Sequence, residues 1–188
     1  SDKIAVTKLI QQLGGAKGAQ STTLRNPFAL CMLVRYTAKI AEEDPNMRAP
    51  LVELLEGWLR HKSDMVNYEA ARALCSLPGV AVEAQSRAIA VLQMFLSSPR
   101  ATLKFAAVRT LAELAQTRPA AVQACNVDME NLITDTNRGV ATYAAVALRR
   151  CTLPLGSTGF DTTRRFRVLS SISSSRMRRC AACVCAAS

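Results

Sequence analysis

The sequence contains few of the residues from which β-sheets, membrane spans and catalytic sites are built. Only 5% of its 188 residues are aromatic, and it has one histidine. No stretch approaches the roughly 18 consecutive apolar residues that a membrane-spanning helix needs, and the N-terminus lacks the basic and apolar regions of a signal peptide. No glycine-rich phosphate-binding loop follows a predicted strand. We therefore expect a soluble protein of the cytoplasm, and not an enzyme, a β-sandwich or a β-barrel.

The sequence is instead rich in aliphatic side chains that recur at a regular interval. Hydrophobic residues make up 49% of it, and alanine and leucine dominate. A helical segment of nine residues begins at residue 66 and recurs at residues 103 and 140, so the step is 37 residues both times. Its first, fifth and ninth residues fall on one helix face. These repeat-packing positions are Val66, Ala70, Leu74, Leu103, Ala107, Leu111, Val140, Ala144 and Leu148.

A helical repeat of this length predicts an all-α fold, an α-solenoid of HEAT/armadillo-like helical hairpin repeats. One such helix cannot cover its own apolar face, so copies must stack on either side of it. The alanines in the middle of each copy allow close approach of a neighbouring helix. We expect Asn26 with Pro27, and Ser98 with Pro99, to begin helices, and Asn137 to cap the third copy.

The first of these caps opens a helix with apolar residues on most of its sides, including Phe28, Leu30, Val34 and Ile40. We expect this helix to be buried. Residues 2–13 carry an amphipathic pattern and are predicted to form an earlier helix.

The charge of the chain divides it into two parts. Residues 1–148 carry 16 Lys and Arg residues against 13 acidic residues, whereas residues 149–188 carry 8 Arg residues against Asp161 alone. The net charge of +10 therefore arises mainly from the end of the chain. We predict a solenoid trunk segment over residues 1–148. Residues 149–188 form an Arg-, Ser- and Cys-rich tail without a helical period, which we expect to be disordered or an artefact of the gene model.

Candidate chemical sites are weak. The tail offers one C-x2-C-x-C cluster and a possible fourth ligand: Cys180, Cys183, Cys185 and Cys151. A tetrahedral zinc site usually pairs two such knuckles on ordered turns, so we predict no metal and no cofactor. His61 lies at a helix end, where we expect it to complement the last carbonyl groups as a cation.

Other residues allow a functional and a structural interpretation. Trp58 and Phe95 could anchor an interface, but their spacing favours core packing between helices. Paired carboxylates are expected to be solvated. Recurring arginines could form a basic ridge for acidic partners, or could simply solvate the helices. The arginines are Arg35, Arg60, Arg72, Arg87, Arg100 and Arg109, and the carboxylates are Glu53 with Glu56 and Asp128 with Glu130.

Several long segments resemble one known family. Residues 61–71, 91–101, 105–111 and above all 124–138 are similar to the trunk of the coatomer gamma subunit family. The resemblance covers roughly residues 3–148 and is weaker in the loop of residues 14–25. A match of this extent arises by chance far less readily than a short motif.

The resemblance implies an α-solenoid segment, taken from a longer chain, that acts as a non-catalytic scaffold in a vesicle coat. The coat acts in transport from the Golgi to the endoplasmic reticulum and within the Golgi. The implied partners are other coatomer subunits, an Arf-family GTPase that recruits the complex, and the Golgi or vesicle membrane through peripheral contact. No nucleic acid is expected. Residues 149–188 match nothing in the family.

Two other classes stay open. A helical-repeat protein with a basic tail could bind nucleic acid, and its affinity would then fall steeply with salt and vanish without residues 149–188. Another solenoid, such as a clathrin-adaptor large chain or a nuclear transport receptor, would share the repeat pattern. The segment of residues 126–138 favours the coatomer family over both.

Overall fold

A computed structural model describes residues 8, 10 and 26–152 of the chain. Within that part every regular element is a helix, which confirms the all-α class. The α-helices are α2 (Pro27–Glu43), α3 (Arg48–Trp58), α4 (Asp64–Ser76), α5 (Val82–Leu96), α6 (Ala101–Thr117), α7 (Pro119–Val122), α8 (Asn126–Leu132) and α9 (Arg138–Thr152), and two 3₁₀ turns are η1 (Pro45–Met47) and η2 (Gln123–Cys125).

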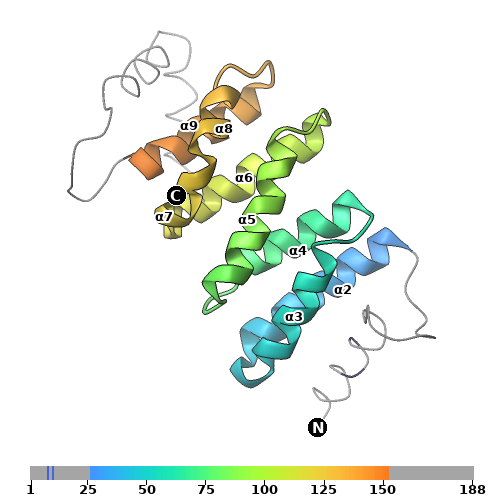
Figure 1. The fold of residues 1–188 in the computed structure, drawn as a ribbon. Coiled ribbons are helices and arrows are strands. Elements are labelled where there is room, and N and C mark those ends of the chain that lie inside the picture. The colour runs from blue at the N-terminus through green and yellow to red at the C-terminus, as the bar shows by residue number, and fades with distance from the viewer. Residues whose placement is uncertain (1–7, 9, 11–25, 153–188) are drawn as a thin grey trace. The chain divides into compact units, whose positions relative to one another are not determined.

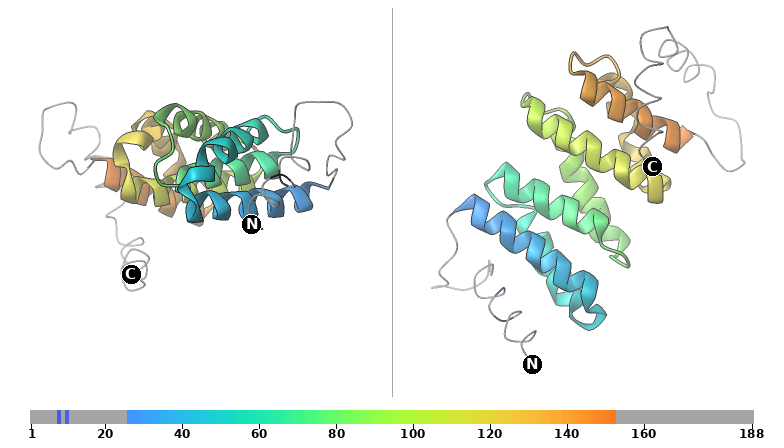
Figure 2. Two further views of the ribbon diagram at one scale, coloured as in Figure 1. Left: turned by 90° about the horizontal axis from the view of Figure 1, so that it is seen from below. Right: turned by 180° about the vertical axis from the view of Figure 1, so that it is seen from behind.

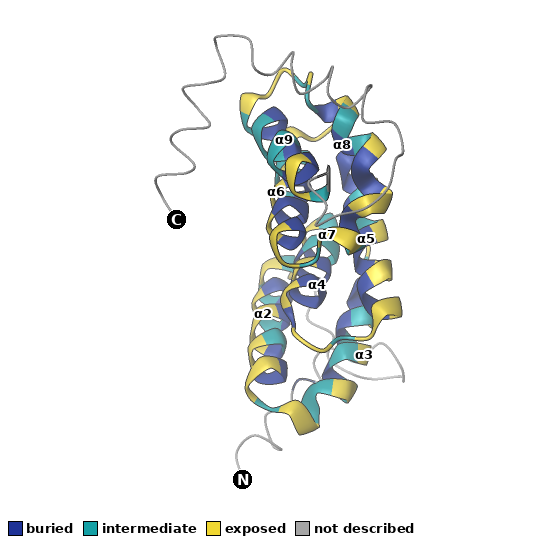
Figure 3. Cartoon of the chain, turned by 90° about the vertical axis from the view of Figure 1, so that its left-hand side faces the viewer, coloured by how far each residue is buried: buried dark blue, intermediate teal, exposed yellow. Residues whose placement is uncertain are grey.

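The helices alternate between two layers (Figures 1 and 2). One layer holds α2, α4, α6 and α9, and the other holds α3, α5 and α8, so each consecutive pair forms an antiparallel hairpin (Figure 3). We call these the first and the second layer. The three copies of the repeated segment are the first-layer helices α4, α6 and α9. The buried side chains form one continuous hydrophobic core between the layers.

The helix ends follow local sequence rules. The side chain of Asn26 accepts a hydrogen bond of 3.0 Å from the backbone N–H of Phe28, and Asn137 caps α9 in the same way through the N–H of Gly139. Both caps confirm their predictions. The expectation for Ser98 and Pro99 is wrong, because α6 begins at Ala101 and Pro99 lies before its first turn.

Two expectations need correction, namely how far α2 is buried and where the trunk segment ends. Helix α2 is not buried on most sides, because Phe28, Met32 and Tyr36 form an exposed row along it. Helix α9 continues to Thr152, so the boundary expected after Leu148 falls inside a helix, and the first compact unit extends to Leu153. The remaining expectations for residues 2–7, 11–13 and 153–188 lie outside the described residues.

Within the described residues, no helix combines the length and the apolar character needed to cross a bilayer.

Candidate docking surface

The repeat-packing positions lie in the core between the layers. Eight of the nine are buried, five of them on α4 and α9 with no exposed surface at all: Val66, Ala70, Leu74, Val140 and Ala144. Leu103 is half-buried and packs against the same core. Trp58 and Phe95 are also buried in the core. These positions therefore form the interior, and any docking surface must be built from the residues around it.

The outer face of the first layer carries a groove of about 780 Å³ that crosses α2, α4 and α6. Both α4 and α6 contribute side chains to the lining, as far as Ser76 at the end of α4 and Thr117 at the end of α6. The residues on the α2 side include Arg35, Lys39 and Glu42. Ten of the fifteen residues that line the groove are polar or charged.

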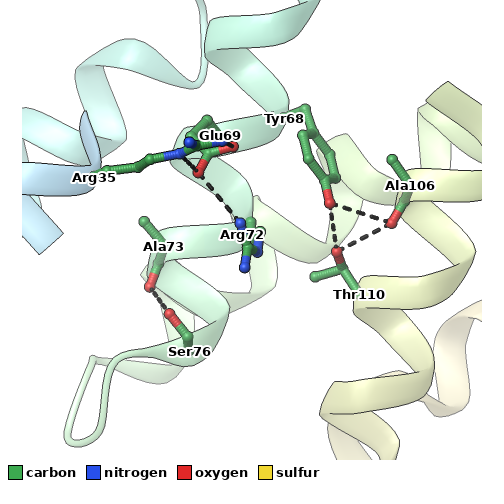
Figure 4. Close-up of polar contacts among 8 residues, drawn as sticks. All are labelled: Arg35, Tyr68, Glu69, Arg72, Ala73, Ser76, Ala106 and Thr110. Carbon is green, nitrogen blue, oxygen red and sulfur yellow. Dashed lines mark hydrogen bonds and ion pairs between the residues drawn. The ribbon is translucent and has the colours of Figure 1, made fainter. Parts of the chain in front are cut away.

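An ion triad joins α2 to α4 at the edge of the groove (Figure 4). Arg35 Nε donates to Glu69 Oε1 at 2.6 Å, and Arg72 Nη1 approaches the same oxygen at 3.4 Å. The Glu69 side chain is only 8% exposed, while both arginines are at least half exposed. The hydrogen bond and the charge of Glu69 raise the pKa of Arg35 above its ordinary value. One carboxylate is thus shared by two cations, which leaves a net positive charge.

A second polar contact joins α4 to α6. The hydroxyl of Tyr68 lies 3.0 Å from Thr110 Oγ1 and 3.4 Å from the carbonyl oxygen of Ala106 (Figure 4). Thr110 itself donates to the Ala106 carbonyl at 3.0 Å, one turn earlier in α6. The two hydroxyls and the carbonyl form a closed set of partners, so this contact fixes α6 against α4.

Arg118 holds the far end of the groove. Its Nη2 donates to the backbone carbonyls of Cys75 and Leu77 at 3.4 and 3.3 Å. These carbonyls lie at the C-terminal end of α4, where a helix leaves its acceptors without intrahelical donors. A cation there also complements the negative end of the helix dipole. Arg118 therefore ties the end of α6 to the end of α4.

Sequence reasoning missed Glu69, Tyr68 and Arg118 as contact residues. A signal for Glu69 was present, since the other two copies carry Ala106 and Tyr143 at the matched position. When one copy of a repeat carries a carboxylate where the other copies carry uncharged residues, this carboxylate indicates a buried ion pair. No comparable signal marked Arg118, whose partners lie more than 40 residues earlier in the chain.

The basic ridge of recurring arginines does not form as one surface. Arg87 pairs with Glu56 on the second layer, whereas Arg100 pairs with Asp64 and Arg109 with Glu113. Three of the six arginines thus have an acidic partner of their own, and Arg35 and Arg72 share Glu69. Glu56 is likewise an ion-pair partner, and Asp128 accepts a hydrogen bond from Gln93 at 2.6 Å. Neither therefore faces solvent without a protein partner.

His61 does not complement helix carbonyls as expected. Its Nδ1 accepts a hydrogen bond of 3.1 Å from the backbone N–H of Ser63, in the turn between α3 and α4. The ring therefore contacts the backbone of the following turn and not the last carbonyl groups of α3.

The described cysteines are buried or half-buried thiols. Burial raises the pKa of Cys75 to about 12 and that of Cys125 to about 11. Both thiols are therefore protonated near neutral pH and behave as small hydrophobic groups. In the part of the chain that the structure describes, no three His, Cys, Asp or Glu side chains gather in a way that could hold a metal ion. Cys180, Cys183 and Cys185 lie outside it.

The last feature of the first layer is the exposed row on α2, which we call the α2 ridge. It consists of Phe28, Met32 and Tyr36, exposed by 67%, 63% and 49%, and Met65 on α4 adds a fourth exposed side chain at 43%. The three α2 residues are spaced by four, so they share one helix face. Exposed apolar side chains that gather in a row mark interaction sites more often than scattered ones do.

Comparison with known proteins places this architecture in a family. A family described as "Adaptin N terminal region" matches residues 1–149. The chain is 48% identical over 153 residues to the coatomer subunit gamma of Drosophila melanogaster, a match that covers 79% of this chain and 17% of that protein. It is 45% identical over 149 residues to coatomer subunit gamma-1 of Homo sapiens, with 79% and 16% covered, and 47% identical over 152 residues to the Arabidopsis thaliana protein, also with 79% and 16% covered.

The chain thus spans about one sixth of the length of these relatives. Among solved structures, the crystal structure of an engineered protein is similar to it with a TM-score of 0.61 and 21% identity, over 93% of this chain and 74% of that one. This likeness concerns the fold alone.

Proposed function

Because the chain belongs to the adaptin N-terminal region family, we propose that it is a trunk segment of a coatomer gamma subunit and acts as a non-catalytic scaffold in the vesicle coat. The observation that carries this proposal is the identity of 45–48% to gamma subunits of an insect, a mammal and a plant over 79% of the chain. The functional role follows from that kinship, because a shared solenoid fold alone would fit many scaffolds.

The structure supports a scaffold through what its surface offers. Two layers of stacked helices present long faces to other proteins, as repeat arrays do. Several polar groups of the groove are already engaged: Glu69 with two arginines, Glu113 with Arg109, and Arg118 with backbone carbonyls. His61 accepts from a backbone N–H and has no hydroxyl or thiol nucleophile as its partner there. The arrangement therefore suits docking better than catalysis.

The proposal includes the partners that the family implies. Other coatomer subunits bind the trunk, an Arf-family GTPase in its GTP form recruits the assembled complex, and the complex contacts Golgi and vesicle membranes peripherally from the cytoplasm. The complex then serves transport from the Golgi to the endoplasmic reticulum and within the Golgi.

Affinity capture tests the proposal. The tagged 188-residue chain is incubated with cytosol, and bound proteins are identified by mass spectrometry. We expect other coatomer subunits to be enriched over a control in which the core is disrupted by Leu74→Asp. Recovery of a different set of partners, such as clathrin-adaptor subunits or ribonucleoproteins, would exclude the assignment. If the recruitment of the chain to Golgi membranes did not depend on the GTP-loaded GTPase, only the proposed role of the GTPase would be excluded.

A further inference from the structure

We draw no further inference here: the strongest candidate, the α2 ridge of Phe28, Met32 and Tyr36, carries none, because the cations and carboxylates beside it on α2 and α4 balance and nothing in the part of the chain that the structure describes shows what covers it.

Discussion

Arg35 on α2 and Glu69 on α4 are joined by an Nε–Oε1 contact of 2.6 Å, although they are 34 residues apart. The carboxylate is nearly buried and the guanidinium is half exposed, so the pair lies at the boundary of the core. Arg72 adds a second, longer contact from the following turn of α4. This arrangement makes Glu69 the polar link between two neighbouring repeats.

Removing the charge of Glu69 should destabilise the stack. In Glu69→Gln the two arginines lose their shared partner, and an amide replaces the carboxylate at a nearly buried position. We expect the free energy of unfolding to fall by about 1–3 kcal/mol, since breaking a buried pair costs more than losing an exposed one. Urea denaturation measures the change.

Glu113→Gln is the matched control for this change. Glu113 pairs with Arg109 at 3.0 Å, but both side chains are more than half exposed. Its loss should cost about 0.5 kcal/mol or less. Equal losses in the two variants would show that the burial of Glu69 contributes nothing to the pair.

The stacking of the repeats depends on small side chains between helices. Ala107 lies in the middle of α6 and has no exposed surface. Ala107→Phe would force α6 away from its neighbours, and we expect a loss of about 1–3 kcal/mol or more by overpacking. Ala90→Phe, at an exposed position of α5, should change the free energy of unfolding by about 0.5 kcal/mol or less. A thermal melt unchanged by Ala107→Phe would contradict the close packing.

The repeat could be predicted from the sequence because it is written in local rules. The segments that begin at residues 66, 103 and 140 fix both the helix period and the stacking step, and the side chains of Asn26 and Asn137 mark two helix starts. Such signals act within a few residues of one another. The fold class and the family therefore followed without knowledge of any contact between distant residues.

The docking surface could not be predicted, because it depends on which helix face its neighbours leave open. Helix α2 has apolar residues around most of its circumference, and periodicity does not tell Val34, which is buried, from Met32, which is exposed. Arg118 gives no local sign of its carbonyl partners on α4. Contacts of this kind depend on how the helices stack in space. The sequence pattern shows that the helices repeat, but it does not show which side chains of different repeats meet.

Asp135 should make the stability of the chain sensitive to acid. Its carboxylate accepts from the backbone N–H of Asn137 at 2.8 Å and from Lys104 Nζ at 3.0 Å, and the first of these bonds is the main cause of a lowered pKa. Because the folded state favours the ionised form, the contribution is complete above the ordinary pKa of about 4 and is lost as the pH falls through the lowered value.

Asp135→Asn removes this dependence. We expect the variant to be less stable than the original chain at pH 7 and to lose less stability between about pH 5 and pH 2. Chemical denaturation at a series of pH values measures both effects. Glu53→Gln, which changes an exposed carboxylate on α3, is the control and should leave the difference between pH 7 and pH 2 nearly unchanged. Parallel stability curves for Asp135→Asn and the original chain would contradict the expectation.

The contact of Tyr68 with Thr110 should couple α4 to α6 energetically. Tyr68→Phe removes one hydroxyl from the set that Tyr68, Thr110 and the Ala106 carbonyl form, and Thr110→Val removes another. Each single change should cost about 0.5–1.5 kcal/mol. In the double variant no hydroxyl is left without its partner, so we expect the two losses to be less than additive by about 0.5 kcal/mol or more.

Thr37→Val tests whether coupling is specific, because Thr37 donates only to the Leu33 carbonyl within its own helix α2. Combined with Tyr68→Phe it should give additive losses, and additivity in the Thr110 pair as well would show that the hydroxyl contact does not join the two repeats.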